Sequence, residues 1–156
     1  MGKGMNDDIR EFALDLGRRA IARDWSAVHS LLAPWLQKTT DTAAVQRFFE
    51  DEYRLTLKDS GVEAMHYPEY PEPQVDGNSF TNAASLREPM SFKPGYVRPI
   101  ADEVTDDNFR YWLSLQLLCS DEQMQQFDFD RFAEIWIAVV ATAAGLRVGY
   151  WNHDPY

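Results

Sequence analysis

The last third of the chain contains two runs that fit a β-hairpin, and this feature constrains the fold most strongly. Residues 131–141 are rich in β-branched and aromatic side chains, and residues 146–152 follow after the segment 142–145. A loop of two or four residues gives the same pairing, with Ala141 opposite Leu146. Because side-chain direction alternates strictly along a strand, this pair predicts the direction of every other side chain in the hairpin.

The predicted register gives the hairpin one apolar face and one mixed face. On the apolar face Val139 lies opposite Val148, Ile137 opposite Tyr150, and Ile135 opposite Asn152. The other face pairs Val140 with Arg147, Trp136 with Trp151, and Glu134 with His153. Residues 109–119 alternate in the same way and predict a further strand, whose apolar face carries Phe109, Tyr111, Leu113 and Leu115. The sequence therefore predicts an antiparallel sheet.

Three amphipathic helices are predicted in the first 60 residues. The first, residues 6–23, begins at Asn6 or Asp7. The second begins at Asp24, and Pro34 should bend or end it. The third, about residues 42–59, follows the capping cluster 39–41 and ends at Gly61. The apolar side chains expected to face the sheet are Ile9, Phe12, Ala13, Leu16, Ala20, Trp25, Val28, Leu31, Leu32, Trp35, Val45, Phe48 and Phe49.

Residues 62–107 differ from both ends, because six of the eight prolines lie there without regular periodicity. Asp76-Gly77 and Pro94-Gly95 are turn signals, so one or two short strands are compatible with this stretch. It is either a lid or a part of the sheet. Together these patterns predict one α+β domain over residues 1–156, with three N-terminal helices packed on a curved, mostly antiparallel sheet.

The charge of the chain limits its partners. It carries 25 acidic and 15 basic residues, a formal charge of −10, without a Lys/Arg cluster, which argues against a nucleic-acid partner. The longest apolar run, Ile135 to Ala144, is shorter than the ~18 residues needed to cross a bilayer. The first residues contain no apolar signal region. No membrane association and a cytoplasmic location are therefore expected.

Two segments resemble a known superfamily. The run 20–28, Ala-Ile-Ala-Arg-Asp-Trp-Ser-Ala-Val, is similar to a helix junction of the nuclear-transport-factor-2-like group, which has a cystatin-like α+β fold and includes ketosteroid isomerase and the SnoaL-like cyclases. Residues 134–140 and 145–151 resemble its closing hairpin. The resemblance covers residues 6–60 and 108–153, while the proline-rich middle departs from it. It implies a cone-shaped pocket and homodimers formed through the outer sheet face, and it fixes no activity.

Enzymes of this superfamily place a carboxylate or a histidine in the pocket, but the predicted apolar face has no carboxylate. It offers a ring of hydrogen-bonding groups that could orient a small apolar ligand. Alternatively, these groups are residues at the edge of the core. The ring comprises Tyr111, Tyr150 and Asn152, with His29 and Tyr53 from the helices.

The predicted outer face carries two further candidate features. Glu134 and His153, with Arg110 nearby, form either a catalytic dyad or an ordinary cross-strand ion pair. Trp112, Trp136 and Trp151 form either a dimer interface or a patch that residues 62–107 cover.

No phosphate loop, nucleophile elbow or metal cluster is found, so no cofactor or metal is expected. The leading hypothesis is a non-catalytic, homodimeric protein that binds a small apolar ligand or a protein partner. One alternative is a proton-transfer enzyme whose base comes from a helix or from residues 62–107. Glu63, His66 and Asp76 are the candidates there. A second alternative is an acidic immunity-type protein that neutralises a partner.

Overall fold

The structure is a computed structural model, and it describes residues 5–59, 73–77, 82–88, 95–118, 125 and 131–153, except for the side chains of residues 52–59, 118 and 131–133. The described chain is α+β, as predicted, with a four-stranded antiparallel sheet in the order β1-β2-β3-β4. The strands are β1 (Gln74–Gly77), β2 (Phe109–Leu118), β3 (Arg131–Thr142) and β4 (Gly145–Asn152). The helices are α1 (Asp7–Ile21), α2 (Trp25–His29), α3 (Pro34–Thr39), α4 (Thr42–Asp59) and α5 (Ala83–Leu86). Within the described chain, no helix is long and apolar enough to span a membrane.

Capping residues in the sequence correctly predict where three of the helices begin. The side chain of Asn6 accepts a hydrogen bond from the backbone N–H of Ile9 at 2.9 Å. Asp24 accepts one from Ala27 at 3.1 Å, and Asp41 accepts one from Ala44 at 2.8 Å. Each carboxylate or amide oxygen satisfies a backbone donor that the first turn of its helix leaves unpaired. These three predictions are confirmed.

The predicted second helix is two helices. It ends at His29, and Pro34 is the first residue of α3, a position where its missing N–H costs nothing. Between the two helices the chain pairs with β4, since the N–H of Ala33 donates to Val148 and the N–H of Val148 donates to Leu31, both at 2.8 Å. Trp25 and Trp35 pack in two different apolar clusters, so the prediction that they share a face is wrong.

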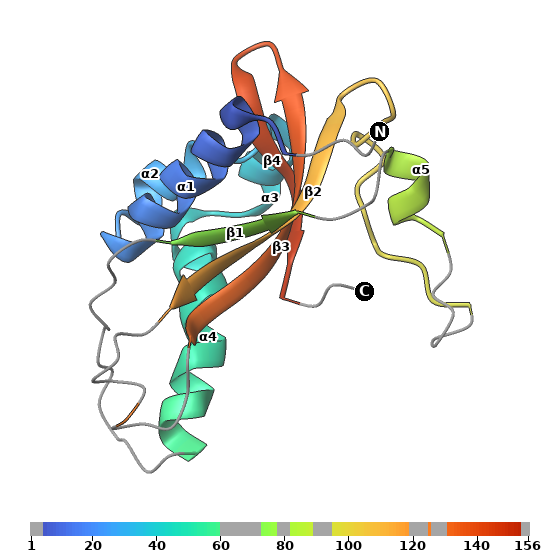
Figure 1. The fold of residues 1–156 in the computed structure, drawn as a ribbon. Helices are drawn as coiled ribbons and strands as arrows, with labels where there is room; N and C mark the ends of the chain where they lie inside the picture. The colour runs from blue at the N-terminus through green and yellow to red at the C-terminus, as the bar shows by residue number, and fades with distance from the viewer. Residues whose placement is uncertain are drawn as a thin grey trace.

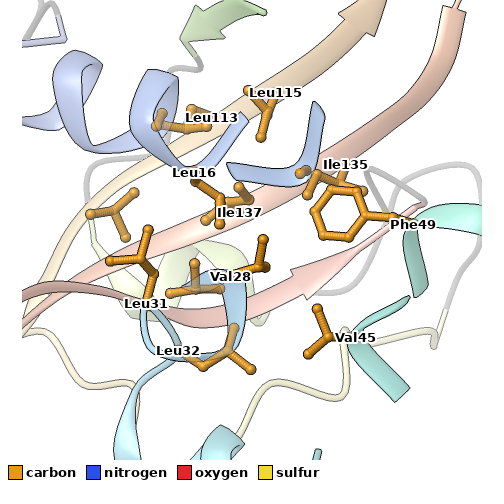
Figure 2. Packing of buried hydrophobic residues seen from close by; sticks show 14 of the residues in the cluster. Leu16, Val28, Leu31, Leu32, Val45, Phe49, Leu113, Leu115, Ile135 and Ile137 are labelled. Atoms are coloured by element: carbon orange, nitrogen blue, oxygen red, sulfur yellow. The ribbon is translucent and has the colours of Figure 1, made fainter. Parts of the chain in front are cut away.

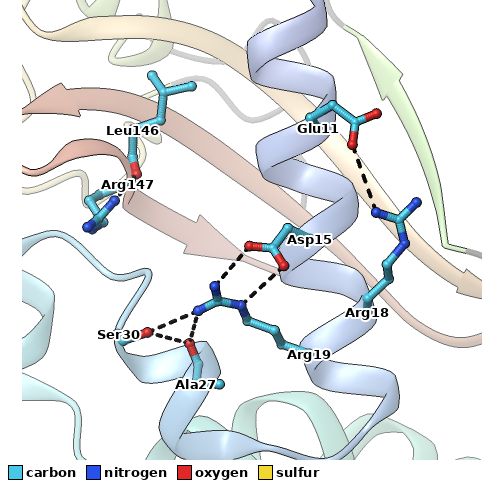
Figure 3. A network of polar contacts seen from close by, with 8 residues as sticks. All are labelled: Glu11, Asp15, Arg18, Arg19, Ala27, Ser30, Leu146 and Arg147. Atoms are coloured by element: carbon cyan, nitrogen blue, oxygen red, sulfur yellow. Dashed lines mark hydrogen bonds and ion pairs between the residues drawn. The ribbon is translucent and has the colours of Figure 1, made fainter.

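The joint between α1 and α2 is held by Arg19 (Figure 3). Its guanidinium contacts Asp15 one turn earlier, with Nη2 3.0 Å from Oδ2. Nη1 donates to the carbonyl of Ala27 at 2.8 Å and to Ser30 Oγ at 3.1 Å. The pair Arg18–Glu11, by contrast, is long at 3.9 Å and exposed. The guanidinium of Arg19 thus bridges α1 and α2 and fixes the position of α2 against α1.

One face of the sheet, which we call the inner face, packs against α1, α2 and α4. Figure 2 shows Leu16 of α1, Val28 of α2 and Phe49 of α4 pointing at the same apolar centre, which the strands supply from the other side. The labelled strand residues of this core are Leu113, Leu115, Ile135 and Ile137, all with at most 1% of their surface exposed. Helix side chains therefore cover the inner face of the sheet around these four strand residues.

A β-bulge in β4 changes the hairpin register. The pairs nearest the turn, Ala141–Leu146 and Val139–Val148, are as predicted. The next pair is Ala138–Tyr150, so Gly149 is the additional residue of the bulge. A Cβ atom on Gly149 would lie 2.5 Å from Cγ1 of Val140, so the sheet packs closely against a glycine here.

Every predicted pair beyond the bulge is wrong, because one extra residue reverses the direction of all the side chains that follow. Ile137 lies opposite Trp151 rather than Tyr150, and Trp136 lies opposite Asn152. Trp151 consequently turns to the inner face, where it stacks on Phe48 of α4 at 4.3 Å between ring centroids. The side chains of Tyr150 and Asn152 move to the opposite face.

A second irregularity lies in β2 between Phe109, which pairs with Val140, and Tyr111, which pairs with Val139. Phe109 therefore packs on the outer face while Tyr111 joins the inner core, and the prediction that they share a face is wrong.

The proline-rich middle contributes both to the sheet and to a cover. Asp76 and Gly77 lie in β1, so the predicted turn at this dipeptide is wrong, whereas Gly95 has the positive φ of +84° that fits a turn. We call residues 82–88 and 95–108 the strap; it includes α5, which lies on the side of the sheet away from α1 and α2 (Figure 1). Its buried residues Ala83, Leu86, Ile100 and Val104 pack on an apolar part of the outer face, which consists of Phe109, Trp112, Ala138, Val140 and Tyr150.

Candidate functional site

The outer face also has a polar part, beyond the residues that pack with the strap. One row of side chains crosses all four strands and consists of Asp76, Ser114, Trp136 and Asn152. The adjoining row contains Gln116 opposite Glu134. We call the group of Asp76, Ser114, Gln116, Glu134 and Trp136 the Trp136 surface.

Hydrogen bonds fix the polar members of the Trp136 surface. Ser114 Oγ donates to Glu134 Oε2 at 3.0 Å, and Gln116 Nε2 donates to Asp76 Oδ2 at 3.0 Å. Both bonds run diagonally between strands, so they tie β1 to β2 and β2 to β3. Asp76 is exposed, Glu134 and Gln116 are half-buried, and Ser114 is buried. The Trp136 surface therefore holds two carboxylates in fixed positions.

Aromatic rings extend from the Trp136 surface to the region under the strap. Half-buried Trp136 stacks on Trp112 with ring centroids 6.0 Å apart, and Trp112 stacks on Tyr150 at 6.3 Å. Asn152 donates from Nδ2 to the hydroxyl of Tyr150 at 3.2 Å. An indole beside carboxylates suits a cationic group, because the carboxylates attract its charge and the ring face stabilises it further.

The predicted acid–base pair Glu134 and His153 is not brought together. Glu134 binds Ser114 on the outer face, whereas Nε2 of His153 lies 2.6 Å from the carbonyl oxygen of Phe48. The His153 ring also stacks on Phe48 at 4.3 Å. The bulge at Gly149 is the reason, since it turns His153 toward α4. Arg110 donates to the backbone carbonyl of Asp107, and it is exposed.

The predicted ligand ring is divided between the two faces of the sheet. Tyr111 lies in the inner core, where its hydroxyl group occupies the place of a Cβ on Gly77. Tyr150 and Asn152 are on the outer face, because the bulge reverses them. His29 is half-buried at the end of α2. The side chain of Tyr53 lies outside the described residues, as do Glu63 and His66.

The three tryptophans predicted to form an interface have three different environments. Trp112 has 0% of its surface exposed, because the strap covers it. Trp151 packs on Phe48 and Phe49 on the inner side. Trp136 alone of the three is a half-buried residue of the outer face. The prediction that they form one exposed patch is wrong, and the alternative that residues 62–107 cover the patch is confirmed for Trp112.

Sequence reasoning missed two buried charged residues. Arg98 of the strap is 5% exposed, lies 5.4 Å from the centre of the Trp112 ring, and donates from Nη1 to the carbonyl of Leu86 at 2.8 Å. Burial lowers the pKa of Arg98, while the nearby Tyr150 and Tyr96 act in the opposite direction. Its segment has no periodicity, so no sequence signal predicted its burial.

The second residue is Glu50 of α4, which is 1% exposed. Its Oε1 accepts a hydrogen bond from Gln46 Nε2 at 2.9 Å, one helical turn earlier. The spacing of four residues between Gln46 and Glu50 is the available sequence signal, but this spacing is equally common on the exposed face of a helix.

The described residues provide neither a metal site nor an enclosed ligand pocket on the strap. Among the described residues, no three His, Cys, Asp or Glu side chains are grouped as a metal ion would require. A surface depression of about 470 Å³ lies on the strap. Within it, Arg87 donates to the carbonyl of Ala101, and the N–H of Ala84 donates to Asp106, so these groups hold the strap together. The depression is lined by Ala84, Arg87, Asp102, Val104, Thr105 and Asp106.

Comparison with known proteins gives no relative: no family model, curated protein or solved structure matches the chain. The resemblance to the nuclear-transport-factor-2-like superfamily therefore stays a prediction.

Proposed function

We propose that this protein binds a protein partner, without catalysis, and that the Trp136 surface is where it does so. The observation that carries the proposal is the half-buried indole of Trp136, which lies in a cross-strand row with two carboxylate-containing hydrogen bonds beside it. Aromatic residues supply much of the binding energy of protein interfaces, and polar groups around them supply specificity. Strands hold all five members, so the surface is preorganised.

The partner that fits this surface is a positively charged polypeptide segment. Asp76 and Glu134 are negative, and the chain as a whole carries a formal charge of −10, so its field attracts basic partners and repels acidic ones. A symmetric contact between two copies would place these carboxylates near their own counterparts. The charge thus favours a different, basic partner over the homodimer expected from the superfamily resemblance, and it favours the partner-neutralising alternative.

A small apolar ligand in a cone-shaped pocket fits the described residues less well. Leu113, Ile137 and Val139 on the inner face are each 0% exposed and pack with helix side chains. The outer face, in contrast, offers charge and an aromatic ring together. The proposal therefore keeps the binding function and moves it from the inner to the outer face.

Titration with decalysine tests the proposal, with tryptophan fluorescence and calorimetry as readouts. We expect binding at low salt that weakens as ionic strength rises. The double variant Asp76→Asn/Glu134→Gln should weaken it at least about tenfold, equivalent to ~1.4 kcal/mol. The asparagine and glutamine side chains have nearly the same shape as the carboxylates that they replace, and each keeps one oxygen that accepts a hydrogen bond.

The matched control is Asp102→Asn/Glu103→Gln. It also removes two negative charges, but from exposed positions on the strap. It should change the affinity less than twofold. Equal weakening by both double variants would mean that decalysine senses only the net charge, and the proposal would then be wrong. Absence of binding to the unaltered protein at low salt would also reject it.

A further inference from the structure

The strap has little regular backbone structure compared with the sheet it covers. Its helix α5 has four residues, and the rest is joined by isolated turn bonds, such as those from the N–H of Ile100 to Arg98 and from the N–H of Val104 to Ala101. The strands beneath it, β2, β3 and β4, are joined by ladders of paired residues. Segments with few cooperative hydrogen bonds open at lower free energy than strands in a ladder.

Arg98 is the charged contact between the strap and the sheet. It is 5% exposed, its guanidinium lies 5.4 Å from the centre of the Trp112 ring, and it donates to the carbonyl of Leu86 within the strap. Opening the strap breaks the contact between Arg98 and Trp112, together with the apolar contacts of Leu86, Ile100 and Val104.

Trp112 connects the strap to the Trp136 surface. Arg98 lies over Trp112, and Trp112 stacks on Trp136. When Arg98 leaves, the ring face of Trp112 joins the indole of Trp136 in one continuous aromatic surface. Phe109 and Tyr150 belong to the same cluster as Trp112, and Trp136 packs against this cluster, so the apolar part of the outer face adjoins the Trp136 surface.

We propose that the strap is a lid closed by Arg98, and that its opening extends the Trp136 surface with Phe109, Trp112 and Tyr150. The role in binding rests on the proposed function, whereas the opening itself does not. A basic segment with apolar side chains would use both parts of the enlarged face. Arg98 then acts as a latch, which competes with the cationic groups of the partner for the Trp112 ring.

Amide hydrogen exchange of the unaltered full chain tests the lid without any partner. The amides of Ile100 and Val104 should exchange at least a hundredfold faster than the protected amides of β3, because they open locally. The change Arg98→Met keeps an unbranched apolar stem and removes the guanidinium, and it should raise their exchange at least tenfold and leave β3 unchanged. Arg10→Met, at an exposed position on α1, should change neither. Equal protection of strap and strand in the unaltered protein would overturn the lid, even if the Arg98 variant fails to fold.

A second experiment tests the lid proposal and the proposed function independently. When decalysine is replaced by a peptide that alternates lysine and leucine, binding should increase strap exchange further and give higher affinity in Arg98→Met than in the unaltered chain. Binding that leaves strap exchange unchanged would reject the lid and retain the Trp136 surface. Fast strap exchange without any peptide binding would retain the lid and reject the proposed function.

Discussion

Replacing Trp112 by alanine should lower the free energy of unfolding by about 3 to 5 kcal/mol, the range for a large side chain removed from a packed core. Trp112 is 0% exposed, and its ring contacts Arg98 of the strap and the rings of Trp136 and Tyr150 of the sheet. Urea unfolding followed by circular dichroism measures the change.

The matched control is Trp136→Ala, which removes the same indole from a half-buried position on the same face. It should cost about 1 to 2 kcal/mol, because less of the ring leaves an apolar environment. If the two variants lose equal stability, or if Trp112→Ala costs less than about 1 kcal/mol, the strap does not bury Trp112 and the division of the outer face is wrong.

Replacing Gly149 by alanine should lower the free energy of unfolding by about 2 to 3 kcal/mol, the upper part of the range for an overpacked core. The new methyl group would lie 2.5 Å from Cγ1 of Val140 and 3.2 Å from Cγ2 of Val104. Neither neighbour is the free end of a flexible chain, so either the bulge or the strap must shift. Thermal and urea unfolding both report the loss.

A double-mutant cycle with Val140→Ala isolates the clash at Gly149. Val140→Ala removes both atoms of residue 140 that the new methyl group would strike, so Gly149→Ala should cost at least about 1 kcal/mol less in that background. Strictly additive effects would contradict the close packing at the bulge. The bulge, and with it the outward position of Tyr150, would then be wrong.

The parts of the fold that the sequence predicted are those governed by short-range signals. Asn6, Asp24 and Asp41 cap helices through bonds that span three residues, and the hairpin pairs adjacent to Gly145 follow from the turn. The register failed beyond Gly149, because a single inserted residue reverses all later side chains. The only available signal was Gly149 itself. A glycine within a strand pattern is compatible with a bulge, but equally with regular pairing.

The candidate site was predicted in pieces and not as a unit. Glu134, Trp136 and Asp76 each appeared among the candidates, but for an acid–base pair, a dimer interface and a catalytic base respectively. They belong together because β1 joins the sheet at Asp76-Gly77, a dipeptide whose local preference is a turn. Pairing with β2, a long-range interaction, overrides that preference. Arg98 could not be found, because neither spacing nor charge pattern marks a buried arginine in an irregular segment.

Under the proposed function, a basic partner contacts Trp136 while the inner-face tryptophans stay in the core. Fluorine-19 NMR of the protein labelled with 5-fluorotryptophan tests it most directly, with each of the five resonances assigned by a tryptophan-to-phenylalanine variant. On addition of decalysine, the Trp136 resonance should shift in a saturable manner, and those of Trp25 and Trp151 should stay in place. Shifts of Trp25 or Trp151 with an unmoved Trp136 would contradict the account.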